Sequence, residues 1–185
     1  RIQPTLHAEK LPDEITYIYV EDLVDSTNWA TYPKRGIVDG VINEEIFNRW
    51  AMNGTGGWIQ MDFGSVQNVH SMAFAGITQT SRKYDFDVLA STDGENWTTV
   101  HTGGAPTTTD KMSILPLGNV QARYIKMIGK GNSTNAWNTW AEVRFYESEA
   151  QQKEDKSYWG IYFASAGAVL GKVGQTGQLT VGGVD

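Results

Sequence analysis

The sequence contains no cysteine, which excludes disulfides, thiolate metal sites and cysteine nucleophiles. Charged residues are also scarce, at 19% of the 185 residues, and the formal net charge at pH 7 is −6. Binding to nucleic-acid phosphates needs a basic face, so this charge argues against a nucleic-acid partner. An acidic glycan bound at a local basic patch stays compatible with the composition.

Long apolar runs and catalytic motifs are missing as well. No stretch approaches 18 apolar residues, and the first residues lack the charged, apolar and small-residue order of a signal peptide. Nucleophile-elbow, Walker, zinc-protease and Ser-x-x-Lys motifs are absent, and the three histidines have no evident partner. Arg82, Tyr84 and Asn135 could form a lyase-like set, but no motif supports it. We expect a non-catalytic piece of a longer protein.

Aromatic residues, in contrast, are plentiful, and the seven tryptophans exceed what core packing alone usually needs. Two of them, Trp137 and Trp140, follow the glycine- and asparagine-rich stretch that begins at Gly129. An indole beside amide donors and acceptors suits the CH and OH faces of a sugar ring. The alternative is that both indoles plug the end of the core.

Short alternating segments predict an all-β fold. After an N-terminal extension over residues 1–14, Ile15–Val20 is typical of a first strand. Residues 21–57 then form a long connection with a helical turn near Glu44–Phe47. Further strands are expected at residues 58–63, 69–77, 84–91, 98–101, 111–115, 123–129 and 142–146. Without helices between them, they predict an antiparallel β-sandwich over residues 15–147.

The C-terminal region divides into two parts. Residues 148–157 are charged and almost free of apolar side chains, which indicates a linker or a short exposed helix. Residues 158–185 contain three strand-like segments separated by glycine turns, too few to bury a core alone. They are interpreted either as the start of a following module or as a hairpin on the sandwich.

Four blocks, in order, carry a resemblance to a known family. They are Asn48–Gly64, Phe86–Thr98, Ala122–Lys126 and Trp137–Val143. Together they resemble the discoidin, or coagulation factor 5/8 type C, family across residues 15–147, which implies a jelly-roll β-sandwich. The Asn-rich loop most resembles carbohydrate-binding modules of family 32, particularly those of bacterial polysaccharide lyases acting on alginate-like polymers. The resemblance therefore implies a secreted or cell-surface bacterial module, monomeric by itself and joined to other modules of a larger parent chain.

The resemblance also implies a structural calcium ion where the early loop meets the last strand. The implied ligands are the side chains of Asp39, Asn48 and Glu142 and the backbone carbonyls near Gly36, Val41 and Ala141. Such a set matches the preference of a hard cation for six to eight oxygen ligands. The segment from Asp39 to Trp50 is longer than the usual family version, and the alternative is a metal-free turn capped by Asp39.

Sugars bind such modules on variable loops at one end of the sandwich. The implied ligand-binding residues are Trp29, Tyr32, Arg82, Lys83, Tyr84, Asn132, Asn135, Trp137 and Asn138. Arg82 could hold a uronate carboxylate by a two-point fork, with Lys83 and Lys130 adding local positive charge. Trp29 and Tyr32 are the favoured stacking platform. Four other aromatic residues occupy family core positions and are expected in the core, namely Trp50, Trp58, Trp97 and Tyr124.

Binding of a polysaccharide, most plausibly an acidic one such as alginate, is therefore the favoured function, with the module targeting a parent enzyme to its substrate. The alternative from another class is a discoidin-type adhesion or membrane-lipid-binding domain. Lipid binding would need exposed apolar spikes flanked by Lys and Arg. The loops are dominated by Asn, Thr and Gly instead, which disfavours a membrane.

Overall fold

The computed structural model describes residues 16–27, 34–42 and 49–155. All of them belong to one unit, which ends at Asp155. They form seven strands, one 3-10 helix and one α-helix: β1 (Asp22–Asp25), η3 (Lys34–Val38), β2 (Trp50–Asn53), β3 (Trp58–Gly76), β4 (Tyr84–Ser91), β5 (Thr98–His101), β6 (Ser113–Asn132), β7 (Trp137–Tyr146) and α1 (Glu149–Glu154). In this part of the chain no helix has the length and apolar character to cross a membrane.

Every strand pair among the described residues is antiparallel. The sheet order is β2-β7-β3-β6-β4-β5, and β1 pairs with β3 beside this path. The all-β prediction is therefore confirmed, and the arrangement is that of an antiparallel β-sandwich.

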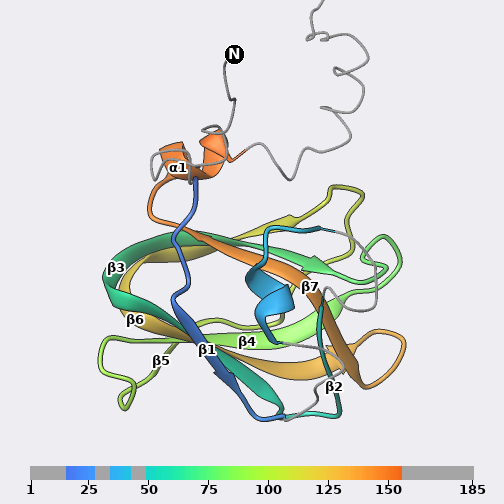
Figure 1. Cartoon of the computed structure of the whole chain (residues 1–185). Coiled ribbons are helices and arrows are strands. Elements are labelled where there is room, and N and C mark those ends of the chain that lie inside the picture. Colours follow the sequence, from blue (N-terminus) through green and yellow to red (C-terminus); the bar gives the residue numbers. More distant parts are fainter. Residues whose placement is uncertain (1–15, 28–33, 43–48, 156–185) are drawn as a thin grey trace, which may run out of the picture. The chain divides into compact units, whose positions relative to one another are not determined.

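The two longest strands, β3 and β6, each take part in both layers of the sandwich (Figure 1). The first part of β3, from Trp58, pairs with β1 and with the second part of β6. Its last part, from Ser71, pairs with β7 and with the first part of β6. Register shifts between Asp62 and Gln67 and between Val69 and Ser71 mark the bend from one layer to the other.

Aromatic rings join the layers across the core. The Phe74 ring of β3 lies 4.7 Å from the Phe86 ring of β4, centroid to centroid. Trp140 of β7 lies 5.4 Å from Phe86 and 4.6 Å from Trp50. These rings are completely buried, so each removes a large apolar area from water. Trp50 is therefore in the core as predicted, and Trp140 of β7 is also a core residue.

The predicted strands are correct in part. Strands β4 and β5 have the predicted bounds. Strands β3 and β6 each join two segments that were expected to be separate, because Gly64 and Gly118 lie inside them with φ of +85° and +80°. Glycine in the left-handed region here serves a bulge and not a chain reversal.

The early part of the chain also differs from expectation. The described residues of the first predicted strand, 16–20, are irregular, and β1 begins at Asp22. Strand β2 lies within the predicted long connection. A strand of four residues is too short to give a recognisable alternation in the sequence. The helical turn expected near Glu44–Phe47 lies outside the described residues.

Helix α1 lies in the segment predicted as a linker or short exposed helix. The Ser148 side chain caps it by accepting a hydrogen bond from the Gln151 backbone N–H, with N and Oγ 3.1 Å apart. None of the helix residues is buried. The Ser71 hydroxyl of β3 nevertheless donates to the Gln152 side chain, with the two oxygens 2.7 Å apart. The helix is thus fastened to the sheet.

Candidate functional site

Two of the loops predicted to bind sugar lie side by side at one end of the sandwich. Their strands pair there, since Tyr84 at the start of β4 is opposite Asn132 at the end of β6. The backbone N–H of Lys83 donates to the Ser133 hydroxyl at 3.1 Å, and the Ser133 N–H donates to the Lys83 carbonyl at 2.9 Å. The structure therefore brings Arg82 and Lys83 next to the Asn-rich loop.

A strained turn presents Arg82. Thr78 has φ of +56°, a conformation that a β-branched residue rarely adopts. Its carbonyl accepts the backbone N–H groups of Ser81 and Arg82, at 3.0 and 3.1 Å. The buried Gln79 side chain anchors the turn, because its Oε1 accepts from the Gly76 N–H at 2.6 Å and its Nε2 donates to the Ser113 hydroxyl at 2.7 Å. Neither Gln79 nor Ser113 was among the site residues predicted from the sequence.

The basic side chains at this end of the sandwich differ in which groups of the protein they contact. Lys83 Nζ donates to the Gly103 carbonyl at 3.0 Å, and Lys130 Nζ lies 2.9 Å from the Asp87 carboxylate. Within the described residues, no carboxylate pairs with the Arg82 guanidinium, and the side chain is partly exposed. Of the predicted basic patch, Lys130 is thus paired with a carboxylate, whereas Arg82 and the exposed Lys83 have no carboxylate partner among the described residues.

The Asn-rich loop is held by its own amides. Asn132 Oδ1 accepts the N–H groups of Thr134 and Asn135, at 2.8 and 3.1 Å. Asn132 Nδ2 donates to Asn135 Oδ1 at 2.8 Å and to the Trp137 carbonyl at 2.7 Å. Asn135 Oδ1 also accepts the Trp137 N–H at 3.0 Å, so Asn132 and Asn135 together build the loop, on which Asn135 is exposed and Trp137 partly exposed.

Two residues of the predicted sugar site lie in the core instead. Tyr84 is completely buried, and its hydroxyl lies 2.6 Å from both the Ile77 carbonyl and the Thr139 hydroxyl. Asn138 is equally buried, because strand β7 turns its side chain inward. Neither can touch a ligand on the folded surface. Trp29 and Tyr32 lie outside the described residues.

Asn138 of β7 ties the end of β2 and its turn to the end of β6. Its Nδ2 donates to the carbonyls of Met52 and Gly54, at 3.0 and 2.8 Å, and its Oδ1 accepts the Gly131 N–H at 2.7 Å. A Cβ atom on Gly129 would lie 2.3 Å from Asn138 Oδ1, so this close approach requires glycine. The residue positions the loop end without contacting a ligand.

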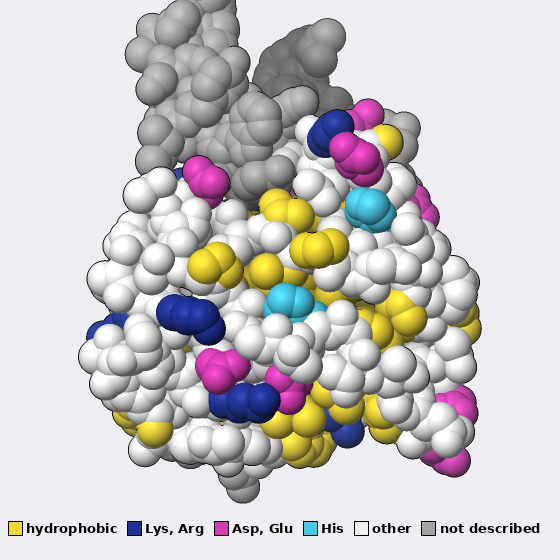
Figure 2. All heavy atoms as spheres, turned by 180° about the vertical axis from the view of Figure 1, so that it is seen from behind, with side chains coloured by type: hydrophobic (Ala, Val, Ile, Leu, Met, Phe, Trp, Pro, Cys, Tyr) yellow, Lys and Arg dark blue, Asp and Glu magenta, His cyan; other side chains and the backbone are white. Residues whose placement is uncertain are grey.

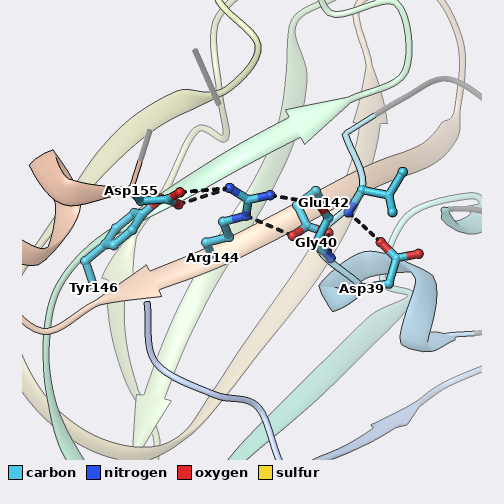
Figure 3. Close-up of polar contacts among 7 residues, drawn as sticks. Asp39, Gly40, Glu142, Arg144, Tyr146 and Asp155 are labelled. Atoms are coloured by element: carbon cyan, nitrogen blue, oxygen red, sulfur yellow. Dashed lines mark hydrogen bonds and ion pairs between the residues drawn. The ribbon is translucent and has the colours of Figure 1, made fainter. Parts of the chain in front are cut away.

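The predicted metal region contains a buried carboxylate. Both Glu142 oxygens accept the Gly40 N–H, at 3.2 and 3.1 Å, and Glu142 Oε2 accepts from Arg144 Nε at 2.9 Å (Figure 3). Asp39 Oδ1 accepts the Val41 N–H at 2.9 Å. Burial, with a smaller effect of the Asp39 charge, raises the pKa of Glu142 to about 8 against the opposing effect of Arg144.

Arg144 lies between the carboxylates of Glu142 and Asp155, which no sequence pattern places together. Its Nη1 lies 3.0 Å from Asp155 Oδ2, and its Nη2 donates to the Gly40 carbonyl at 3.2 Å. The Tyr146 hydroxyl donates to the same Asp155 oxygen at 2.7 Å. Burial alone would lower the pKa of Arg144, but Glu142 and Asp155 outweigh it and raise the pKa.

Alternation along β7 places Glu142, Arg144 and Tyr146 on the face opposite Val143 and Phe145, and in a half-buried strand that face is exposed. All three are buried instead. The Tyr17 ring stacks on Arg144, at 5.0 Å from its Cζ, and Asp155 covers the same face. No local pattern could have shown this, because Asp155 lies in the predicted linker.

The donor set of this region fits a divalent cation in its charge. The carboxylates of Asp39, Glu142 and Asp155 outnumber the single guanidinium of Arg144, and oxygen ligands of this kind suit calcium. No group of three or more acidic or histidine side chains gathers as a metal site in the described residues. Asn48 lies outside them. Calcium therefore stays a prediction.

Three aromatic residues expected in the core lie on its outside. Trp58, Trp97 and Tyr124 are partly exposed. Ile59, Met61 and Phe63 are buried on one face of β3, so the alternation turns Trp58 to the opposite face. Lys126 Nζ lies 4.9 Å from the Trp58 ring centroid and 4.4 Å from that of Trp97.

The comparisons with known proteins agree with this architecture. The profile of the F5/8 type C domain matches residues 22–143. The CBM32 module of AlyQ, solved in complex with 4,5-unsaturated mannuronic acid, has 27% identity and a TM-score of 0.64, over 71% of this chain and 98% of that one. A truncated AlyQ with CBM32 and alginate lyase domains has 28% identity and a TM-score of 0.63, over 70% of this chain and 32% of that one.

A pectin-binding carbohydrate-binding module is also similar. It has 25% identity and a TM-score of 0.61, over 72% of this chain and 94% of that one. No curated protein sequence matches the chain.

Proposed function

This chain belongs to the F5/8 type C domain family, and on that premise we propose that its loop end binds an acidic polysaccharide such as alginate. The chain is a non-catalytic module, as are the similar carbohydrate-binding modules. Its role is carbohydrate binding in general, and the proposal concerns the class of sugar and the residues that hold it.

The open Arg82 guanidinium is the observation that carries this proposal. In a chain with a net charge of −6, it is a partly exposed cation with no carboxylate partner among the described residues. Its backbone is fixed by the Thr78 turn, so the backbone loses little further entropy when a ligand binds. The AlyQ module, which is 27% identical to this chain, was solved with an unsaturated mannuronic acid.

The binding mode follows from the chemistry of the loop end. Arg82 would donate two N–H groups to one uronate carboxylate. Trp137 offers an apolar ring face and Asn135 an amide to the rest of the sugar. Trp29 and Tyr32 stay predictions for a further stacking surface. A shallow site with one ion pair and one or two rings gives dissociation constants of roughly micromolar to millimolar.

Titration of alginate oligosaccharides into wild type and Arg82→Ala tests the proposal. We expect Arg82→Ala to weaken binding about tenfold and to leave the melting temperature unchanged, because the side chain makes no ion pair in the described part of the chain. Arg82→Lys should recover only part of the affinity, since a point charge cannot form the fork. Lys34→Ala, which removes an exposed cation of η3, is the matched control for net charge.

Salt and neutral polymers complete the test. Added salt should weaken binding to the acidic polymer, because an exposed ion pair is screened. If neutral galactans bound as well as alginate and Arg82→Ala had no effect, the acidic ligand would be wrong while sugar binding survived. Binding to anionic lipid vesicles but to no glycan would instead favour the membrane-lipid function.

We also propose that a structural calcium ion stabilises the loop between η3 and β2. Asp39 and Glu142 would supply its carboxylates, with the carbonyls near Gly36, Val41 and Ala141 and the Asn48 side chain completing the shell. The ion would offset the repulsion between the Asp39 and Glu142 carboxylates. This role is structural and involves no reaction step.

Metal removal tests the calcium proposal. Chelation should lower the melting temperature by about 5 °C or more, and excess calcium should restore it. Glu142→Gln should melt at the same temperature with and without chelator. A melting temperature that chelation left unchanged in wild type would show that the turn is metal-free.

We further infer that the module works outside the cell, joined to a polysaccharide-degrading enzyme. The truncated AlyQ structure, of which this chain covers 32%, contains a CBM32 module together with alginate lyase domains. Tethering such a module to a catalytic domain raises the local concentration of substrate.

A further inference from the structure

One outer face of the sandwich carries several apolar side chains among charged ones. Its strands are β3, β6 and β4, whose inward residues are buried. Its outward side chains include Trp58, Ile128 and Leu89, all partly exposed, and Val24 of β1 is 46% exposed. The outer faces of antiparallel sheets are ordinarily polar, and exposed apolar patches mark interaction sites. Figure 2 shows hydrophobic side chains gathered beside basic and acidic ones on one face of the molecule.

Lys126 is the centre of this face. In the sheet register it lies between Gln60 of β3 and Leu89 of β4. Its ammonium group lies between the indoles of Trp58 and Trp97, at 4.9 and 4.4 Å from the ring centroids. These three side chains, Trp58, Trp97 and Lys126, are called the Lys126 platform.

Two neighbouring carboxylates, those of Asp62 and Asp87, are already paired. Arg123 donates to both oxygens of Asp62, at 2.8 and 3.0 Å, and Lys130 Nζ lies 2.9 Å from Asp87. Asp93, in the turn before Trp97, accepts hydrogen bonds from that same turn. Within the described residues, no carboxylate pairs with Lys126. The platform therefore presents a positive charge between two aromatic rings.

The platform adjoins the proposed sugar-binding loops. Lys126, Ile128 and Lys130 alternate outward along β6, which ends at Asn132 in the Asn-rich loop. Outward residues on one strand are about 7 Å apart, so the face continues from the loop end in short steps. The turn before Trp58 is tied to the same strand, because Gly129 N–H donates to the Gly57 carbonyl at 2.8 Å.

We propose that the Lys126 platform is a second subsite that binds another uronate unit of the same polysaccharide chain. The proposal rests on the proposed function at the loop end and extends it. The Lys126 ammonium would pair with the carboxylate of the sugar, and the exposed parts of the indoles would contact its apolar face. A contact with two rings at an exposed site is weak, so the ammonium stays available to an anion.

Two contact points on one chain change what the module recognises. An oligosaccharide long enough to reach from Arg82 to Lys126 gains the second contact as an intramolecular event. The module then binds the interior of an extended polymer as well as a short end piece. Its affinity should rise with ligand length beyond the statistical gain from repeated units.

Titration with oligouronates of increasing length tests this inference. After correction for the number of ways in which a long oligomer can bind, wild type should bind long oligomers about fivefold more tightly than short ones. Lys126→Met keeps an apolar stem between the indoles but removes the ammonium group. It should bind the shortest oligomer like wild type and lose the gain with length. Arg82→Ala should weaken the shortest oligomer, and Lys34→Met is the control for net charge.

A second variant guards against a folding defect in Lys126→Met. Gln60 lies opposite Lys126, so Gln60→Glu would place a carboxylate beside the ammonium without altering the core. It should remove the gain with length as well. A gain that persisted in both variants, or no gain in wild type, would overturn the second subsite. Failure of wild type to bind any short oligouronate would instead overturn the proposed function itself.

Discussion

The phenol of Tyr84 shows how a polar group can serve the site from within the core. Its hydroxyl bonds the Ile77 carbonyl and the Thr139 hydroxyl directly beneath the turn that carries Arg82. Gly76 packs against the same ring, where a Cβ atom would lie 2.4 Å from it. The residue therefore acts on the loop through packing and hydrogen bonds.

Tyr84→Phe tests this assignment. We expect a loss of about 1 to 3 kcal/mol in the free energy of unfolding, because the buried partners of the hydroxyl lose a hydrogen bond. Urea denaturation measures it, and sugar binding by the folded variant should stay close to wild type. A variant of full stability that binds sugar poorly would return Tyr84 to the ligand-contacting residues.

Asp62 provides a pH-dependent contribution to stability. The hydrogen bonds from Arg123, with a smaller effect of the Gly64 N–H, hold the pKa of Asp62 below its ordinary value. The stabilisation is therefore present above about pH 4, the unfolded-state pKa, and is lost as the pH falls through the lower folded-state pKa.

Asp62→Asn tests this direction of the pH dependence. At pH 6 the variant should melt roughly 1 to 3 °C lower, since the ion pair is partly exposed. The difference should shrink towards pH 2, where Asp62 is protonated in wild type. A difference that grew as the pH fell would contradict the assigned shift.

Some side-chain placements were within reach of the sequence. Tyr84 shares the parity of Phe86 and Val88 on β4, which indicates an inward side chain. The same rule turns Trp58 away from Ile59 and Met61. Burial of Asn138, in contrast, depends on carbonyls of β2 and its turn, so strand periodicity carries no sign of it.

At the scale of elements, helix α1 leads to Asp155, which supplies the buried partner for side chains of the last strand, β7. Asp155 accepts from both Arg144 and Tyr146 of β7, and all three side chains are buried. The segment thus supplies a counter-charge that the strand needs in order to bury a guanidinium.

Asp155→Ala should destabilise the domain by about 3 kcal/mol, because Arg144 loses one of its two buried carboxylate partners. Chemical denaturation measures the loss. Glu149→Ala is the control from the same helix: it removes an exposed ion pair with Lys153, and we expect no measurable change. Equal stability of Asp155→Ala and Glu149→Ala would show that the buried pair contributes nothing.

Element boundaries were predictable where one periodicity held without interruption. Strands β4 and β5 lie between clear turns and were found with their bounds. Gly64 and Gly118 are ambiguous, because the same residue suits a chain reversal and a bulge. Only the pairing partner decides between them, and that partner is distant in sequence.

At the scale of the whole molecule, the position of Asp155 bears on where the domain ends. The predicted domain closes at residue 147, but the buried partner of Arg144 lies beyond that point. A chain of residues 1–147 should therefore be several kcal/mol less stable than a chain of residues 1–155. Thermal unfolding of the two fragments measures the difference, and identical melting temperatures would support the shorter boundary.

The participation of β3 and β6 in both layers also governs how this protein can be made. During synthesis the last part of β3 emerges long before its partners, which are the first part of β6 and all of β7. Until then Trp50 lacks its partner ring, because Trp140 follows much later in the chain, whereas Phe86 follows Phe74 on the next strand. The Trp50–Trp140 contact can therefore form only after nearly the whole domain has left the ribosome, and closure is slow because such contacts are far apart in sequence.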